Sequence, residues 1–213
     1  MRIRFDLNFS VGQIVKLLVL SDLALMAGWG LVEPIFSIFI IQSIPGATVA
    51  TVGFSVPFYW LTKSFIELPV ANYLDRTKGE RDDFYALTGS LLLAGIAAIS
   101  FIFIRTPLQL YLVQMLHGIA FGIYTPAWAG VFSRHLDRER ESFDWSLDAT
   151  AVGISAGISG FIGGLVANWF GFTSLFMLAG VFSVIAAFFV MAVPTMTFPP
   201  KTSKEVFVPE KKV

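Results

Sequence analysis

The segment LLVLSDLALMAGWGLVEPIFSIFII, residues 17–41, decides the fold class of this chain. It is almost wholly apolar, and a helix needs about 20 such residues to cross the hydrocarbon core of a bilayer. Within it only Asp22 and Glu33 are ionisable. Because an ionisable residue deep in a membrane span costs about 2.5–3.5 kcal/mol on insertion scales, each needs a partner or a wet cavity. The segment therefore predicts a membrane-spanning helix with one side turned toward other protein.

Five further apolar runs follow the first, at residues 51–74, 84–104, 108–132, 146–169 and 173–193. They predict an all-α membrane protein with six transmembrane helices, which form one domain, residues 1–194. The remaining residues, 195–213, are rich in Pro and Lys and are predicted to be a flexible cytoplasmic tail. A charged tail that ends at Val213 is typical of a natural terminus.

The composition excludes several function classes. Only 14% of residues are charged, against about 25% in an ordinary soluble domain. This disfavours a soluble enzyme, a nucleic-acid binder and a disordered protein. The chain has no Cys and only two His, so a disulfide framework, a metal site and a cofactor are not expected.

Lysine and arginine residues predict the orientation, because they concentrate in short cytoplasmic loops. Of the 15 in the chain, Lys63 lies inside the second span and Arg105 lies between the third and fourth. All the others precede the first span, connect spans two and three or four and five, or belong to the tail. Both termini are therefore expected in the cytoplasm, and the plasma (inner) membrane is the expected location.

An internal repeat relates the first three spans to the last three. Gly30-Leu-Val-Glu-Pro34-Ile-Phe36 in the first span corresponds to Gly122-Ile-Tyr-Thr-Pro126-Ala-Trp128 in the fourth. Val70-Ala-Asn-Tyr73 in the second corresponds to Val166-Ala-Asn-Trp169 in the fifth. Since three spans is an odd number, the second copy has to be inverted in the membrane. Inverted repeats of this kind are typical of secondary transporters.

Polar and aromatic residues recur at helical spacing in four of the spans, which predicts that spans one, two, four and five surround a polar interior. Spans three and six have no ionisable residue in their interiors and are expected to face lipid. The residues expected to line a substrate cavity or to couple transport are Asp22, Trp29, Glu33, Lys63, Glu67, Gln114, His117, Tyr124 and Trp128.

These residues also have structural interpretations. Lys63 and Glu67 lie one helical turn apart and can form an internal ion pair. His117 can be a neutral hydrogen-bonding residue, and Trp29 and Trp128 can be ordinary packing residues. Glu33 is the hardest to explain in this way, because it lies well inside its span with no cation within one turn.

Glycines are concentrated in the fifth span, at Gly153, Gly157, Gly160, Gly163 and Gly164. Gly153 with Gly157, and Gly160 with Gly164, are small-xxx-small pairs. Such pairs allow two helix backbones to approach closely. We therefore expect these positions to serve helix packing.

Three motifs resemble those of the major facilitator superfamily. The loop Ala71-Asn-Tyr-Leu-Asp75-Arg76-Thr-Lys-Gly79-Glu-Arg81 resembles its signature loop. The segment Gly160-Phe-Ile-Gly163-Gly164 resembles its fifth-helix motif, and Gln114-Met-Leu-His117-Gly118 resembles its fourth-helix motif. Two departures stand out: Gln114 replaces the buried Arg of many members, and one extra residue separates Arg76 from Gly79. The resemblance covers the chain as one six-helix half of a fold that normally has twelve helices.

The resemblance implies a secondary active transporter of a small solute, in which the substrate lies between two such halves. A parallel homodimer would bury the polar face of a single half, and a symmetric dimer is the commonest oligomer. Asp75, Arg76, Gly79 and Arg81 would form a cytoplasmic gate. Glu33 is the candidate for proton coupling, because a buried carboxyl group costs far less when neutral.

Two alternatives remain open at this level. The chain could be one subunit of a heteromeric transporter or a non-transporting membrane assembly module. A third interpretation, an intramembrane protease built on Ser159, is disfavoured because no His follows that serine. The substrate is also open, since acids among aromatic residues suit a cationic or amphipathic solute, whereas Trp, Gln and His suit a sugar.

Overall fold

The computed structural model describes residues 11–77 and 79–193, and within these ranges every regular element is helical. The elements are α1 (Gln13–Val32), η1 (Glu33–Ile35), α2 (Phe36–Ser43), α3 (Val49–Arg76), α4 (Arg81–Phe101), α5 (Pro107–Arg134) and α6 (Glu141–Met191). The all-α class expected from the sequence is confirmed for the described residues. The tail 195–213 and the basic residues Arg2, Arg4 and Lys78 lie outside them.

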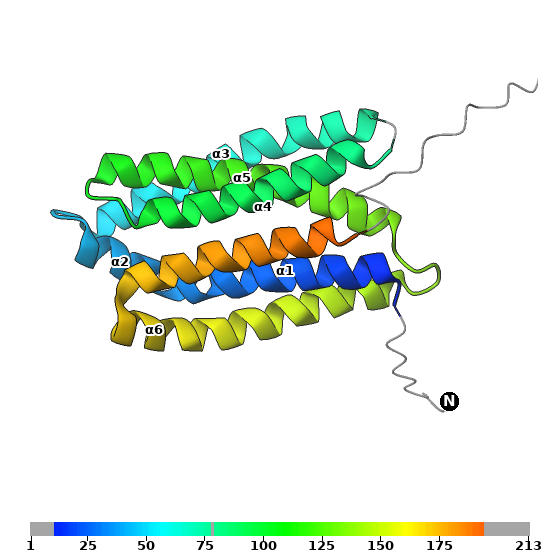
Figure 1. The fold of residues 1–213 in the computed structure, drawn as a ribbon. Coiled ribbons are helices and arrows are strands. Elements are labelled where there is room, and N and C mark those ends of the chain that lie inside the picture. The colour runs from blue at the N-terminus through cyan, green and yellow to red at the C-terminus, as the bar shows by residue number, and fades with distance from the viewer. Residues whose placement is uncertain (1–10, 78, 194–213) are drawn as a thin grey trace, which may run out of the picture.

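The long element α6 consists of two helical arms. Gly171 interrupts it with a non-helical backbone, φ 77° and ψ 171°, a conformation that glycine adopts without steric cost. Figure 1 shows the chain reversing direction there, so that residues 141–170 and 172–191 run in opposite directions, and α1 contacts both arms. The reversal falls between the fifth and sixth predicted spans.

The first helical stretch is broken at Pro34. Proline lacks an amide proton, and its ring clashes with the carbonyl group four residues earlier. The backbone tightens into the 3₁₀ turn Glu33–Ile35 at this point and then resumes as α2. The break leaves Glu33 exposed on the surface of the bundle.

Among the residues that the structure describes, three helical stretches are long and apolar enough to cross a membrane: Gln13–Ser43, Arg81–Phe101 and Glu141–Met191. The last of these includes both arms of α6. The remaining long helices, α3 and α5, carry more polar residues, among them Lys63 and Glu67 on α3 and Gln114 and His117 on α5. Passage of all six segments through a membrane stays a prediction.

The helices form a bundle in which the connections alternate between two ends (Figure 1). The start of α1, the α3–α4 turn, the α5–α6 turn and the end of α6 share one end. The α2–α3 turn, the α4–α5 turn and Gly171 share the other. Helix α1 packs along α6, α3 packs along α5, and α4 packs against both α5 and α6.

Close helix contacts occur at positions that the predicted repeat makes equivalent. A methyl group at Gly30 would lie 3.1 Å from the Ser159 Cβ, and one at Gly122 would lie 2.8 Å from the Lys63 carbonyl oxygen. Gly30 corresponds to Gly122, and Lys63 corresponds to Ser159, at the offsets of the motif pairs in the sequence. Each predicted repeat unit thus places a glycine of its first helix against the second helix of the other unit.

The glycines of the fifth span divide into two groups. Gly163 lies directly against α1, where a methyl group would come within 2.1 Å of the Leu31 carbonyl oxygen, and Gly160 lies near Pro34. At Gly153, Gly157 and Gly164 a methyl group would meet nothing within 4 Å. Only the first group serves packing inside one chain.

Candidate functional site

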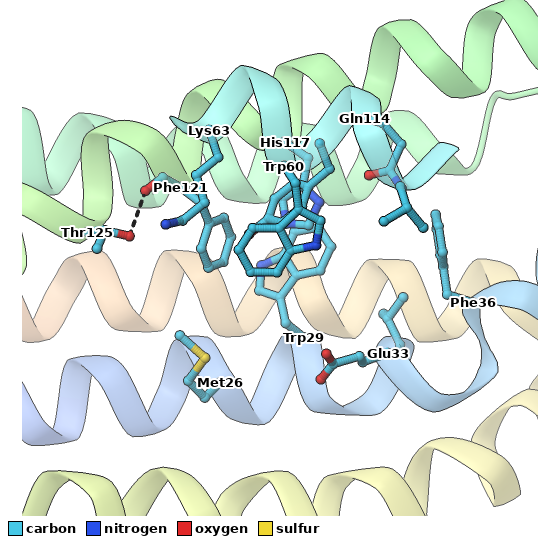
Figure 2. Close-up of a pocket in the computed structure, with 13 residues that line it drawn as sticks. Met26, Trp29, Glu33, Phe36, Trp60, Lys63, Gln114, His117, Phe121 and Thr125 are labelled. Atoms are coloured by element: carbon cyan, nitrogen blue, oxygen red, sulfur yellow. Dashed lines mark hydrogen bonds between the residues drawn. The ribbon is translucent and has the colours of Figure 1, made fainter. Parts of the chain in front are cut away.

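A cavity of about 490 Å³ lies between the first helical stretch, α3 and α5. Figure 2 shows side chains of α1 and those of α3 and α5 pointing toward one another across it. The lining residues are Met26, Trp29, Val32, Glu33, Phe36, Val56, Tyr59, Trp60, Lys63, Gln114, His117, Phe121 and Thr125. Five of the nine residues expected at a cavity are therefore brought together: Trp29, Glu33, Lys63, Gln114 and His117.

Aromatic rings form the wall around His117. Its imidazole stacks on the Trp29 ring at a centroid distance of 3.8 Å and an interplanar angle of 8°. Tyr59 lies 4.5 Å away on another side, and Phe121 meets the imidazole edge-on at 4.9 Å. Within the described residues the imidazole makes no hydrogen bond, so ring packing holds it in place.

The two charged residues of the lining differ in their pairing. Lys63 Nζ lies 2.6 Å from Glu67 Oε2, which confirms the ion pair that their spacing allowed. The same ammonium group lies 5.8 Å from the Trp60 ring centroid. Glu33 has no ion-pair partner among the described residues. The cavity therefore holds one carboxylate whose charge nothing nearby balances.

The remaining expected residues lie outside the cavity. Asp22 is buried and accepts a hydrogen bond from the Tyr124 hydroxyl at 2.6 Å. Trp128 stacks on Phe132 at 4.5 Å in the core. Glu67 does not line the cavity itself, but it pairs with Lys63, which does. Asp22 and Tyr124 thus join α1 to α5, and Trp128 fits its packing interpretation.

The lining also contains Met26 and Phe121, which share helical faces with the expected site residues. The lining residues that were not singled out from the sequence are Val32, Phe36, Val56, Tyr59, Trp60 and Thr125. A signal for two of them was present. Tyr59 and Trp60 precede Lys63 by four and three residues, which places them on the same helical face. No group of three His, Cys, Asp or Glu residues able to hold a metal ion occurs within residues 11–77 and 79–193.

Comparison with known proteins decides the family. The sequence matches the Major Facilitator Superfamily over residues 18–212. This chain belongs to that superfamily. Together with the apolar helical stretches, this membership identifies a multi-pass integral membrane protein.

A similar protein is an uncharacterised MFS-type transporter of Methanocaldococcus jannaschii, 25% identical over 162 residues. The match covers 76% of this chain and 40% of the archaeal protein. The chain thus spans less than half of the length of this relative. No solved structure gives a significant match.

The signature loop of this superfamily member lies at the end of the bundle where α3 turns into α4. Asp75, Arg76, Gly79 and Arg81 are all exposed there, and Gly79 has a left-handed backbone, φ 105°. The ion pairs at this end involve neighbouring residues. Arg134 at the end of α5 contacts Asp83 at 2.6 Å and Glu80 at 3.2 Å. These contacts tie the α3–α4 turn to α5.

Proposed function

We propose that this chain is a secondary transporter of a small solute, which binds in the cavity between α1, α3 and α5. Family membership and the name of the archaeal relative, an MFS-type transporter, support transport. The cavity supports a binding role because it combines aromatic walls with ionisable groups inside an apolar bundle. Intramembrane ionisable residues usually mark a pathway for a solute or an ion.

The position of Glu33 is the observation that carries the proposal. It lies within the apolar stretch Gln13–Ser43, yet its side chain is exposed and unpaired within the described residues. A carboxylate that faced lipid at this depth would cost about 2.5–3.5 kcal/mol on insertion scales. A second six-helix unit laid over the cavity would remove that exposure.

The second unit in this proposal is another copy of the same chain, in parallel orientation. The surfaces available for it are α3 and the first arm of α6, where Phe65, Leu68, Phe161 and other large apolar side chains are exposed. Gly153, Gly157 and Gly164 lie on the same arm with open space beside them. Small residues allow close backbone approach to a neighbouring helix.

Alternating access follows from the inverted repeat in this proposal. The matching contacts of Gly30 with Ser159 and of Gly122 with Lys63 support the repeat. Gly95 on α4 and Gly180 on α6 also face each other reciprocally, with a methyl group on either lying 3.3–3.5 Å from the other's carbonyl oxygen. Such a pair suits a pseudo-two-fold axis between the halves, about which two alternative packings could exchange.

The proposed orientation places the end with the basic turns in the cytoplasm of the cell, at the plasma (inner) membrane. Arg76, Arg81, Arg134 and Arg138 lie at or near that end, and Arg105 lies at the other (Figure 1). Single cysteines at Thr48 and Thr202 test this. An impermeant thiol reagent added outside should label residue 48 only, and labelling of residue 202 instead would reverse the orientation.

Assembly is tested by the mass of the purified complex in detergent and by cross-linking in membranes. A cysteine at Gly157 should form a disulfide with its counterpart in a second copy, whereas one at Gly163, which faces α1, should not. A monomer in native-like membranes would exclude the homodimer. Co-purification of a different six-helix protein would instead favour a heteromeric transporter or an assembly module.

Proton coupling through Glu33 is the most specific part of the proposal. Glu33→Gln keeps the shape of the protonated side chain, so it should permit solute exchange but abolish accumulation driven by a pH gradient across proteoliposomes. Glu139→Gln, the same change in an exposed turn, is the matched control. Uphill accumulation by Glu33→Gln would show that Glu33 is structural, with Asp22 or Glu67 the next candidates.

A further inference from the structure

We propose that the cavity selects an organic cation with an apolar, ring-containing body, which it holds between Glu33 and the aromatic wall. This inference rests on the proposed function, since it assigns a substrate class to the same cavity. Two features of the cavity support this assignment: the charge balance of its lining and the aromatic rings that line it.

The charge balance favours a cation. Lys63 is neutralised by Glu67 at 2.6 Å, and the exposed fractions of the two side chains are only 15% and 32%. Glu33 remains as one uncompensated negative charge. An anionic solute would have to bring a second negative charge beside it, and like charges brought together repel each other.

The ring faces favour a cation as well. The Lys63 ammonium group already lies near the Trp60 ring, 5.8 Å from its centroid. This distance is within the range of cation–π attraction. Trp60 keeps 56% of its surface exposed, and in the view of Figure 2 it lies with Trp29 between Lys63 and Glu33. A solute cation in the cavity would therefore meet a lining that contains two indole rings.

Two groups of the lining are not available to a sugar. One face of Trp29 is covered by His117 at 3.8 Å and is not free to stack on a pyranose ring. The Thr125 hydroxyl already donates to the Phe121 carbonyl oxygen at 2.9 Å. Other polar groups of the lining, such as the Trp29 indole N–H, have no hydrogen-bond partner among the described residues, so the charge balance is the main argument for a cation over a sugar.

Two ions of matched size and opposite charge provide the test: tetraphenylphosphonium and tetraphenylborate. Their binding to the purified full chain is measured by equilibrium dialysis in potassium-free detergent buffer. Tetraphenylphosphonium should bind at least tenfold more tightly. Glu33→Gln should weaken its binding about tenfold, or about 1.4 kcal/mol, and Glu139→Gln should leave it unchanged.

A second pair of variants tests the charge balance without changing Glu33. Glu67→Gln leaves Lys63 unbalanced and should weaken phosphonium binding, whereas Lys63→Gln leaves Glu67 unbalanced and should strengthen it. The opposite order of these two variants would overturn the proposal. So would equal or tighter binding of tetraphenylborate to the wild-type chain, or unchanged phosphonium binding by a folded Glu33→Gln protein.

Uptake into proteoliposomes separates failure of this inference from failure of the transport proposal. If the chain binds tetraphenylphosphonium selectively but takes up no cation, the proposed ligand class is supported and the transport proposal is refuted. If the chain takes up another solute and tetraphenylphosphonium does not inhibit that uptake, the transport proposal is supported and the organic-cation substrate class is refuted. If both hold, Glu33→Gln should still exchange the cation, but only at a correspondingly higher concentration.

Discussion

The contact between Gly163 and α1 gives the sharpest test of the packing in this chain. The perturbation is Gly163→Ala. Its methyl group would lie 2.1 Å from the Leu31 carbonyl oxygen. An ordinary carbon–oxygen contact is about 3.3–3.6 Å long, so the first arm of α6 would have to move away from α1 by more than about 1 Å.

The magnitude follows from two opposing terms. Overpacking of a close contact costs about 1–3 kcal/mol. Replacing Gly with Ala inside a helix returns about 0.5–1 kcal/mol, because the unfolded backbone loses freedom. We therefore expect Gly163→Ala to lower the free energy of unfolding by about 1–2 kcal/mol.

Gly157→Ala is the matched control on the same arm, because a methyl group there meets nothing within 4 Å. It should leave the stability unchanged or raise it by up to about 1 kcal/mol. The assay is unfolding in mixed detergent–SDS micelles followed by tryptophan fluorescence, at a concentration that gives monomers. A Gly163→Ala protein at least as stable as wild type would refute the close approach of α6 to α1.

Three further predictions concern the polar contacts of the bundle. Tyr124→Phe removes the buried hydroxyl that donates to Asp22 at 2.6 Å and should lower the free energy of unfolding by about 1–3 kcal/mol. The same unfolding assay measures this decrease, and adding Asp22→Asn should recover part of the lost stability. Arg134→Gln leaves Asp83, which is 1% exposed, without its ion-pair partner and should lower the free energy of unfolding by about 1–3 kcal/mol. The expected readout is faster proteolysis in the α3–α4 turn, and unchanged cleavage would argue against a link between this turn and α5. Asp75→Asn should slow uptake into proteoliposomes without reducing the amount of protein inserted; full activity would show that the altered signature loop has lost the gate role implied by the resemblance.

Much of the helical framework could be predicted from the sequence, because the signals for it are local. Apolar runs of bilayer length mark the helices, and the gap between the predicted spans 146–169 and 173–193 contains the reversal at Gly171. The ion pair of Lys63 with Glu67 is likewise local, since residues four apart on a helix are neighbours.

The cavity could be predicted only in part. Helical spacing places Asp22 on the same face as Trp29 and Glu33, but it does not say which neighbouring helix each turn of that face meets. In the structure the Glu33 turn opens into the cavity, whereas the Asp22 turn meets Tyr124. That difference depends on how α5 packs against α1, which cannot be predicted from the spacing of residues within α1 alone. The same reason explains why Trp128, on the face of Gln114 and His117, lies in the core.

The reversal at Gly171 has a mechanical consequence. A connection of several residues lets two helices slide or tilt independently, but a single left-handed residue leaves no slack between the arms of α6. Any displacement of the first arm at this end has to pull the second arm with it. The turn around residues 135–140 at the opposite end, between α5 and α6, is longer. Of the two connections of the first arm, the one at Gly171 is therefore the stiffer, and a large movement of this arm has to pivot about its Gly171 end.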